Sequence, residues 1–524
     1  MQILLSFLLK LHLSRLFLFA LIAFLLTGCA TMYSISHWST LLVTRPRSPV
    51  FVSLPYVNGP LEDAERSRVR GEFSSDLADD PLVRDMGLLE GDRDRMVMVS
   101  FSGGGARASV FSAFVMRELE RAYNDLHAQS GQGGEGDALE DIKAAEVPPM
   151  IDRLDAISGV SGGAIYASYI AVLYSLNEAG YNNLLDELEF IKGRDPGARR
   201  EAFTNLVGEY FHSYAYFGGR AGCSYLSPTN LCLGPLAGLR TDADLVDLYA
   251  LNLDTDYVLG VLTRLKMRDL KPRPRFFFNA ATSQFRPMIF TQSGYRQGPA
   301  ASVDKKGAPE DALLSYFKGT PSVFQPGRPF AYALTLEDLN SSADGFPISY
   351  SVMASAAYPG AMEPLELEKY AEGENGELEY NGFVNIVDGG LYENFGITTA
   401  LETFNYIQRR LAEQNRPLKL TLLSINNANP ERETEAQRSA WTDPRGIIGV
   451  DTPIRGLTPA VQNAFELYND RYSWITKILR DHLATREDVL FIDVNLADCP
   501  ELQADPELDV QTNYVINAEE IETL

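Results

Sequence analysis

A serine between glycines is the first group in this sequence that could act as a nucleophile. Residues 159–163 read Gly-Val-Ser-Gly-Gly and lie between a short apolar run and a longer apolar stretch with helical spacing. A strand–turn–helix of this kind strains the serine backbone, and Gly159 and Gly163 keep side chains out of the crowded turn. Ser161 would then lie at a helix N-terminus, where N–H groups and the dipole favour a developing oxyanion. The pattern predicts a nucleophilic serine.

A second glycine-rich segment could supply N–H groups to an anion. Residues 102–107 read Ser-Gly-Gly-Gly-Ala-Arg and follow another short apolar run. Consecutive glycines let backbone N–H groups converge on a phosphate or an oxyanion. A Walker A loop would end in Gly-Lys-Ser/Thr, and a dinucleotide fingerprint would have its third glycine further on. With a nucleophile downstream, we interpret Gly103, Gly104 and Gly105 as an oxyanion hole, while Arg107 could contact a substrate phosphate or brace the loop.

The base that accepts the serine proton has two candidates. Asp388 ends an apolar run and precedes two glycines, so we place it at the end of a strand, where sites of α/β proteins assemble. His482 follows Ser161 and Asp388 in the chain order of an α/β-hydrolase triad, but residues 478–483 read as the end of an amphipathic helix. A direct carboxylate base fits better. Because an aspartate with its ordinary pKa of about 3.9 is a weak base, burial must raise the pKa of Asp388.

Taken in order along the chain, these motifs resemble those of the patatin-like phospholipase family. A further segment, residues 354–360 (Ala-Ser-Ala-Ala-Tyr-Pro-Gly), is similar to that family's segment ahead of the aspartate. The resemblance covers about residues 96–390. It implies a Ser161–Asp388 dyad without histidine that cleaves acyl esters of lipids, in the manner of a phospholipase A or lysophospholipase, with no metal or cofactor. Two positions depart from the family pattern: Ser102 stands where the family commonly has Asp, and Ala108 stands where it commonly has Gly. Both bear on loop geometry, but neither removes an N–H donor.

Two other functions are also compatible with these residues. One is a histidine-dependent serine esterase of the α/β-hydrolase type that uses His482. The other is a membrane-anchored binding module that has lost catalysis. The intact serine, aspartate and glycine-rich loop favour an active serine lipid acyl hydrolase over both.

The elements that must position these groups alternate along the chain. Short apolar runs predict buried strands, and apolar residues at helical spacing predict the helices between them. The predicted strands are 96–101, 154–158, 276–278, 288–290, 383–387, 420–425 and 489–494. The predicted helices are 108–127, 164–176, 398–410 and 461–480. This order predicts an α/β fold, a three-layer α/β/α sandwich with a mostly parallel central sheet and with helical and loop insertions.

Segments that depart from the alternation predict the domain organisation. Residues 29–92 have few periodic apolar runs and are predicted to form an N-terminal arm, followed by a catalytic domain at 93–495 and an acidic segment at 496–524. Residues from about 184 to 270 are rich in helical pattern and then in aromatics, and 292–330 are rich in Gly, Pro and Ser. Both read as insertions that could cover a site, although aromatics in an insertion more often form its own small core.

The N-terminus reads as an export signal. Lys10 and Arg15 precede an apolar run, 16–26, that suits a signal-peptide core and is short for a membrane-spanning helix. The run ends in Leu-Thr-Gly before Cys29, which resembles the lipobox of bacterial lipoproteins. That resemblance implies removal of residues 1–28, acylation of Cys29 and, since alanine follows it, a place in the cell envelope at the periplasmic side of an outer membrane. An uncleaved anchor is the alternative.

The net charge and the cysteine content limit which partners, disulfides and metal sites can be predicted. The formal net charge is −24, so the chain should repel polyphosphate backbones and is not expected to bind nucleic acid. The same charge resists adsorption to an anionic bilayer, which leaves the lipid anchor as the predicted membrane contact. In an exported chain Cys223 and Cys232 could close a small disulfide loop, with Cys499 as the odd thiol. No second Cys or His pair has ligand spacing, so no metal site is predicted.

Overall fold

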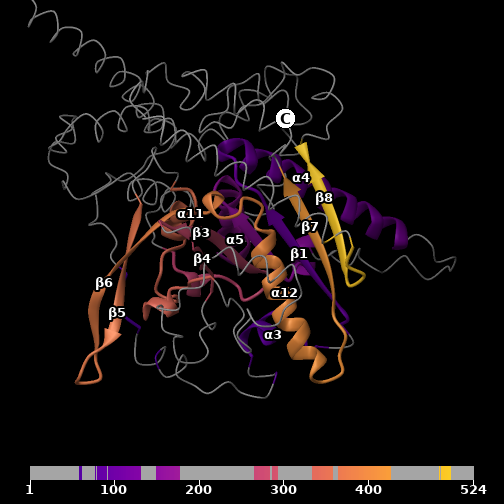
Figure 1. Cartoon of the computed structure of the whole chain (residues 1–524). Helices are drawn as coiled ribbons and strands as arrows, with labels where there is room; N and C mark the ends of the chain where they lie inside the picture. The colour runs from indigo at the N-terminus through magenta and orange to yellow at the C-terminus, as the bar shows by residue number, and fades with distance from the viewer. Residues whose placement is uncertain are drawn as a thin grey trace, which may run out of the picture.

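The computed structural model describes the parts of the chain that surround the central sheet. These are residues 58–61, 66, 77, 80–90, 93–131, 149–176, 265–283, 286–292, 333–357, 364–426, 483 and 485–496. Within them, helices lie on both faces of one twisted sheet, as Figure 1 shows. Most of the predicted 184–270 insertion, the helix predicted at 461–480 and the segment 497–524 lie outside the described residues.

The described sheet has the strand order β5-β6-β3-β2-β1-β7-β8, with β4 paired to β3. Neighbours from β3 through β2, β1 and β7 to β8 are parallel, whereas β4, β5 and β6 join in antiparallel fashion. The bounds are β1 Arg95–Phe101, β2 Ala156–Val160, β3 Arg275–Thr282, β4 Pro287–Phe290, β5 Leu365–Glu372, β6 Leu378–Asp388, β7 Lys419–Asn426 and β8 Val489–Asn495. The predicted α/β fold with a mostly parallel sheet is confirmed.

The helices form two layers over this sheet. On one face α4 (Gly105–Gly131), α5 (Gly162–Leu176) and α11 (Ile348–Ser355) contribute to one apolar cluster. On the other face α3 (Pro81–Asp85) and α12 (Ile397–Ala412) contribute to a second. Because both faces of the sheet are covered, its central strands are apolar at successive positions rather than at alternate ones.

β3 illustrates how a strand buried on both faces is encoded. Phe276 and Phe278 belong to the α5 side of the core, while Phe277 belongs to the α12 side, and all three side chains are fully buried. The run of three phenylalanines therefore fills both layers at once. This is why the short apolar runs in the sequence correspond to strands.

Among the described α-helices and strands, three have no counterpart in the sequence prediction. β5 carries a charged residue at every second position early in the strand, and it pairs with β6 in a hairpin at one edge of the sheet, at the left in Figure 1. α11 precedes that hairpin. α3 lies in the segment predicted as an arm, yet Leu82, Val83 and Met86 are buried in the α12-side cluster, so the end of that segment packs into the core.

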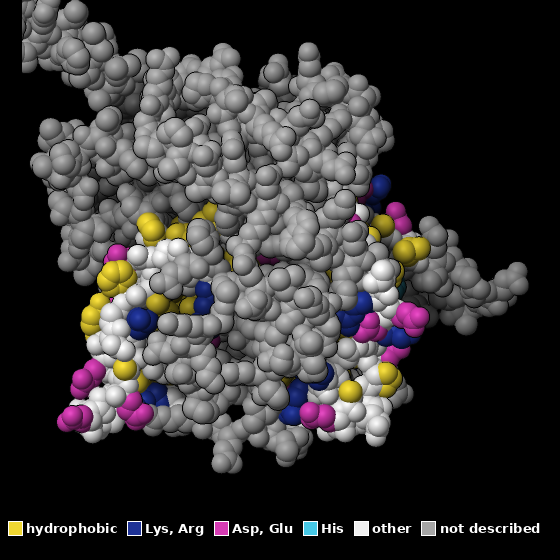
Figure 2. Space-filling model, in the orientation of Figure 1, with side chains coloured by type: hydrophobic (Ala, Val, Ile, Leu, Met, Phe, Trp, Pro, Cys, Tyr) yellow, Lys and Arg dark blue, Asp and Glu magenta, His cyan; other side chains and the backbone are white. Residues whose placement is uncertain are grey.

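On the face drawn in Figure 2, the described surface is mixed in charge. In the view of Figure 2, acidic and basic side chains are interspersed among smaller groups of hydrophobic ones. Among the described residues, no helix has both the length and the apolar character that crossing a membrane requires.

Candidate active site

Ser161 occupies a sharp turn between β2 and α5. Its φ of +49° is uncommon for a residue with a side chain and marks local strain. A Cβ on Gly159 would lie 2.8 Å from the Cα of Ala164, and one on Gly163 would lie 2.6 Å from the Phe101 carbonyl oxygen. The predicted strained turn with sterically required glycines is confirmed. α5 begins at the next residue, so its N-terminal dipole favours negative charge beside Ser161.

The side chains of Ser161 and Asp388 meet. The Ser161 hydroxyl donates a hydrogen bond to the Asp388 carboxylate, with Oγ 2.7 Å from Oδ2, and Oδ1 accepts from the N–H of Gly390 at 2.7 Å. Asp388 is only 4% exposed, and this burial raises its pKa to about 6 although the hydrogen bonds from Ser161 and Gly390 oppose the rise. The predicted rise is confirmed. A carboxylate with this pKa is a far better proton acceptor than an ordinary aspartate.

The register of β3 explains how two residues far apart in sequence come together. Asn279 pairs with Val160 of β2 on one side of β3, and Ala280 pairs with Asp388 of β6 on the other. Ser161 follows Val160 directly, so serine and aspartate flank the same level of β3. The predicted strand end at Asp388 is confirmed, since β6 ends at this residue. β6 runs antiparallel to β3, and Asp388 reaches Ser161 because its strand ends opposite Ala280.

The last residue of α11 and the segment just after it bind the backbone of Ser161 and Asp388. The N–H of Ser161 donates to the Ser355 hydroxyl at 2.9 Å, and the N–H of Asp388 donates to the Ala357 carbonyl at 2.9 Å. Both contacts come from the segment 354–360, which the structure describes as far as Ala357. In the sequence this segment is notable only for its resemblance to a family motif, and no role was predicted for Ser355.

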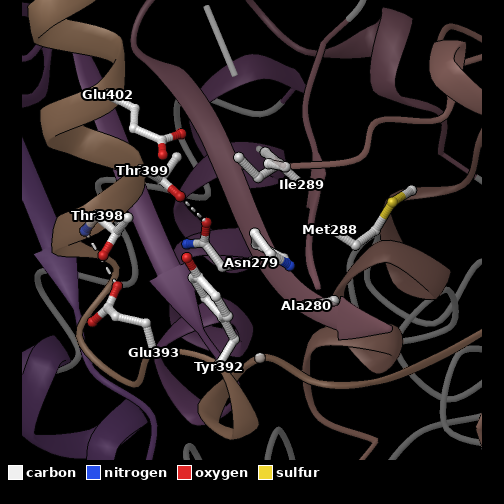
Figure 3. Close-up of a pocket in the computed structure, with 12 residues that line it drawn as sticks. Asn279, Ala280, Met288, Ile289, Tyr392, Glu393, Thr398, Thr399 and Glu402 are labelled. Carbon is white, nitrogen blue, oxygen red and sulfur yellow. Dashed lines mark hydrogen bonds between the residues drawn. The ribbon is translucent and has the colours of Figure 1, made fainter. Parts of the chain in front are cut away.

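The side chain of Asn279 links β3 to the end of β2 and to α12. Its side-chain N–H groups donate to the Ser158 hydroxyl and the Gly159 carbonyl, each at 2.9 Å, and its Oδ1 accepts from the Thr399 hydroxyl at 2.6 Å. Figure 3 shows the last contact between β3 and α12. Sequence reasoning missed Asn279, although a polar residue directly after three buried phenylalanines was a usable signal, since a buried amide needs partners.

A small pocket lies beside Asn279, between β3, β4 and α12 (Figure 3). Gly389 lines it, but neither Ser161 nor Asp388 does. Glu402 projects into this pocket while only 6% exposed, and burial raises its pKa to about 8. Burial also raises the pKa of Glu393 to about 7, although backbone N–H groups that donate to its carboxylate oppose the rise. The pocket is therefore separate from the contact between Ser161 and Asp388.

The three glycines of the loop after β1 differ in what they can do. The N–H of Gly103 donates to the Asn394 carbonyl at 2.7 Å, so it is already engaged and, contrary to our expectation, is not directed at an oxyanion. Gly104 and Gly105 have φ values of +132° and +62°, which a residue with a side chain rarely adopts. Among the described residues, none accepts a hydrogen bond from either N–H. The predicted oxyanion donors are thus reduced to Gly104 and Gly105.

Arg107 and one of the histidines also lie among the described residues. Arg107 lies in the first turn of α4 and is 7% exposed. His127 is the one histidine among the described residues, and it is exposed on α4 with its ring 4.5 Å from that of Tyr123. It lies about 33 Å along the helix axis from the end of α4 at the site, too far to act as a base.

The other predicted residues fall outside the described part of the chain. His482, Cys29, Cys223 and Cys232 are among them, so the triad alternative, the lipidation and the disulfide stay predictions. Within the described ranges, no group of three or more His, Cys, Asp or Glu side chains is arranged to hold a metal ion.

Comparison with known proteins adds a family match. A family model described as patatin-like phospholipase matches residues 99–401, more than half of the chain. No curated protein matches. The solved structures that are similar include human GIVD cytosolic phospholipase A2 in complex with methyl gamma-linolenyl fluorophosphonate, at 14% identity over 46% of this chain and 30% of that chain, with a TM-score of 0.22. Human GIVD cytosolic phospholipase A2 is 11% identical over 75% of this chain and 54% of that chain, with a TM-score of 0.25. The chain spans less than two thirds of either structure.

Proposed function

Because the chain belongs to the patatin-like phospholipase family, a family of lipid acyl hydrolases, we propose that it hydrolyses acyl esters of lipids through Ser161 and Asp388. The finer activity that we propose is that of a phospholipase A or lysophospholipase. The observation that carries the proposal is the 2.7 Å hydrogen bond from the Ser161 hydroxyl to the Asp388 carboxylate, made at a strained turn before a helix.

In the first half of the reaction, the Ser161 oxygen attacks the ester carbonyl carbon. Asp388 accepts the hydroxyl proton on Oδ2 as the new C–O bond forms. The N–H groups of Gly104 and Gly105, together with the N-terminal dipole of α5, stabilise the negative charge on the carbonyl oxygen. When the tetrahedral intermediate collapses, Asp388 returns the proton to the leaving alcohol, and the acyl group stays on Ser161.

In the second half, water replaces the alcohol. Asp388 accepts a proton from the water as it attacks the acyl carbon, and the same oxygen donors stabilise the second intermediate. Collapse releases the fatty acid and returns the proton to Ser161. A pKa of about 6 supports this cycle, because the carboxylate is ionised at neutral pH yet gains a proton more readily than an ordinary aspartate does.

We further propose that the protein acts at a membrane to which it is tethered by acylated Cys29, in the bacterial cell envelope. The signal-like residues 1–28 and the cysteine that follows them support this placement. The net charge of −24 also favours it, because so acidic a chain gains little from electrostatic attraction to an anionic bilayer.

The test is a lipid panel on the purified chain without residues 1–28. Phosphatidylcholine, lysophosphatidylcholine and triacylglycerol would be offered with released fatty acid as the readout, while a fluorophosphonate probe reports whether Ser161 is reactive. We expect fatty acid from at least one phospholipid and covalent label on Ser161. A folded protein that binds these lipids, releases no fatty acid and takes no label would instead support the binding-module alternative.

A further inference from the structure

We propose that Ser355 is a positioning residue for the reaction, which holds the strained Ser161 turn so that the serine hydroxyl stays directed at Asp388. The inference rests on the proposed function and adds to it a residue outside the dyad and the oxyanion loop. Its starting point is the hydrogen bond from the Ser161 N–H to the Ser355 hydroxyl oxygen, 2.9 Å long.

The Ser355 hydroxyl is used in both directions. It accepts from the N–H of Ser161 and donates its own hydrogen to the carbonyl oxygen of Asn279. Ser355 is fully buried at the last position of α11, so no solvent competes for either bond. A hydroxyl meets both demands because it has one donor hydrogen and acceptor lone pairs, and an alanine meets neither. Through these two hydrogen bonds, the Ser355 oxygen links the turn that holds Ser161 to β3.

Asn279, at the β3 end of this link, is itself held by side-chain hydrogen bonds. The side chain of Asn279 donates to Ser158 and Gly159 at the end of β2 and accepts from Thr399 of α12 (Figure 3). Asn279 thus binds the strand that leads into the turn, while its backbone carbonyl binds the residue that supports the turn. Through Ser355, the position of β3 in the sheet therefore fixes the position of the Ser161 backbone.

The segment that follows α11 also positions Asp388. The Ala357 carbonyl accepts from the N–H of Asp388, so Ser355 and Ala357 hold the nucleophile and the base two residues apart on one segment. A change at Ser355 frees Ser161 but leaves the Ala357 contact of Asp388 in place. The expected result is a longer and less aligned bond between Ser161 and Asp388, which lowers nucleophile reactivity more than substrate binding.

The matched pair Ser355→Ala and Ser351→Ala tests this in the full-length protein. Ser351 is also fully buried on α11, one turn earlier, and its hydroxyl donates at 3.2 Å to the Pro347 carbonyl of its own helix. We expect Ser355→Ala to lower kcat and the rate of fluorophosphonate labelling of Ser161 by about 10- to 100-fold with little change in KM. Ser351→Ala should stay within about twofold of wild type.

Two more readouts separate positioning from loss of folding. The acid limb of the pH–rate profile should move to higher pH in Ser355→Ala, since the Ser161 hydrogen bond that lowers the pKa of Asp388 is weakened. Ser351→Ala should leave the limb in place. If Ser355→Ala fails to fold, Ser355→Cys decides, because a thiol of similar size forms only weak hydrogen bonds and should also slow labelling.

Labelling of Ser161 at the wild-type rate in a folded Ser355→Ala protein, or in Ser355→Cys, would overturn the inference. An equal loss in Ser355→Ala and Ser351→Ala would do the same, since it would indicate a general effect on α11. Absence of label on the wild-type protein is a different result, which would count against the proposed hydrolase itself.

Discussion

The backbone N–H of Gly103 donates a 2.7 Å hydrogen bond to the carbonyl oxygen of Asn394, in the segment that follows Asp388. The contact joins the glycine-rich loop after β1 to the segment that follows Asp388. A Cβ on Gly103 would lie 2.0 Å from Oδ1 of Asn394 and 3.2 Å from the Cβ of Ser161. The glycine at this position therefore allows three parts of the site to pack together, and a side chain would force at least one of them to move.

Gly103→Ala should consequently lower kcat by about 100-fold or more, because a displacement near 1 Å of catalytic groups costs this much. Ester hydrolysis and thermal unfolding of the same preparations measure it. Gly59→Ala is the matched control, since a Cβ there meets no atom within 4 Å. Activity of Gly103→Ala equal to that of the control would show that the loop can shift without consequence.

The pH dependence of hydrolysis should follow the ionisation of Asp388. Its pKa is raised to about 6 by burial, and only the carboxylate form can accept the Ser161 proton. The value of kcat/KM should therefore be level above neutrality and fall about tenfold for each pH unit below 6, as expected for one ionisation. A profile measured with a soluble ester avoids changes in vesicle structure. Full activity persisting to pH 4 would mean that the base is a different group.

Much of the fold could be predicted because the central strands are buried on both faces. The phenylalanines at 276–278 fill two layers, and such runs are visible without any structure. β5 was missed for the opposite reason. Leu365 and Leu367 are buried while Glu366 between them is exposed, so the strand alternates over a length too short to stand out among its charged neighbours.

The candidate site shows the same contrast between local and long-range features. The sharp turn at Ser161 and the strand end at Asp388 could be predicted, because both impose glycines at fixed spacing. The contacts of Ser355 and Asn279 could not, since they depend on how α11 and β6 align with β3, and long-range register is not encoded in local pattern. The engagement of the Gly103 N–H by Asn394 likewise requires a residue nearly three hundred positions away.

Glu402→Gln should stabilise the protein at alkaline pH. Burial raises the pKa of Glu402 to about 8, so the folded protein keeps a proton that the unfolded chain loses near pH 4.5. The resulting contribution to stability is fully present below pH 4.5 and is lost as the pH rises through 8. The melting temperature of wild type should therefore fall more steeply than that of Glu402→Gln between pH 5 and 9.

The comparison needs an exposed control. Glu374 is exposed in the β5–β6 turn, and Glu374→Gln makes the same chemical change without burial. If the melting temperatures of wild type and Glu402→Gln changed with pH in parallel over this range, the result would contradict a protonated Glu402 in the pocket.

Cys29→Ser should abolish lipidation, because the thiol is the group that would be acylated. Growth with a labelled fatty acid, followed by separation of membrane and soluble fractions, measures the result. We expect label and membrane association in wild type and neither a label nor a cleaved precursor in the variant. Label that survives in Cys29→Ser would rule out this cysteine as the anchor.

Asp388→Asn and His482→Ala together distinguish a dyad from a triad. The Asn substitution is nearly isosteric, can keep the hydrogen bond from the Gly390 N–H and removes a buried ionisable group, so the fold should be retained. Its amide cannot accept the Ser161 proton, and general bases contribute about 10²- to 10⁴-fold, so turnover should fall by that factor. If Asp388 is the direct base, His482→Ala should change turnover by no more than about twofold. In a triad the imidazole would take the proton and both substitutions would be crippling. The 2.7 Å bond between Ser161 and Asp388 leaves no room for an imidazole between them, which is why we expect only the first to matter. A folded His482→Ala protein with turnover as low as that of Asp388→Asn would refute the dyad.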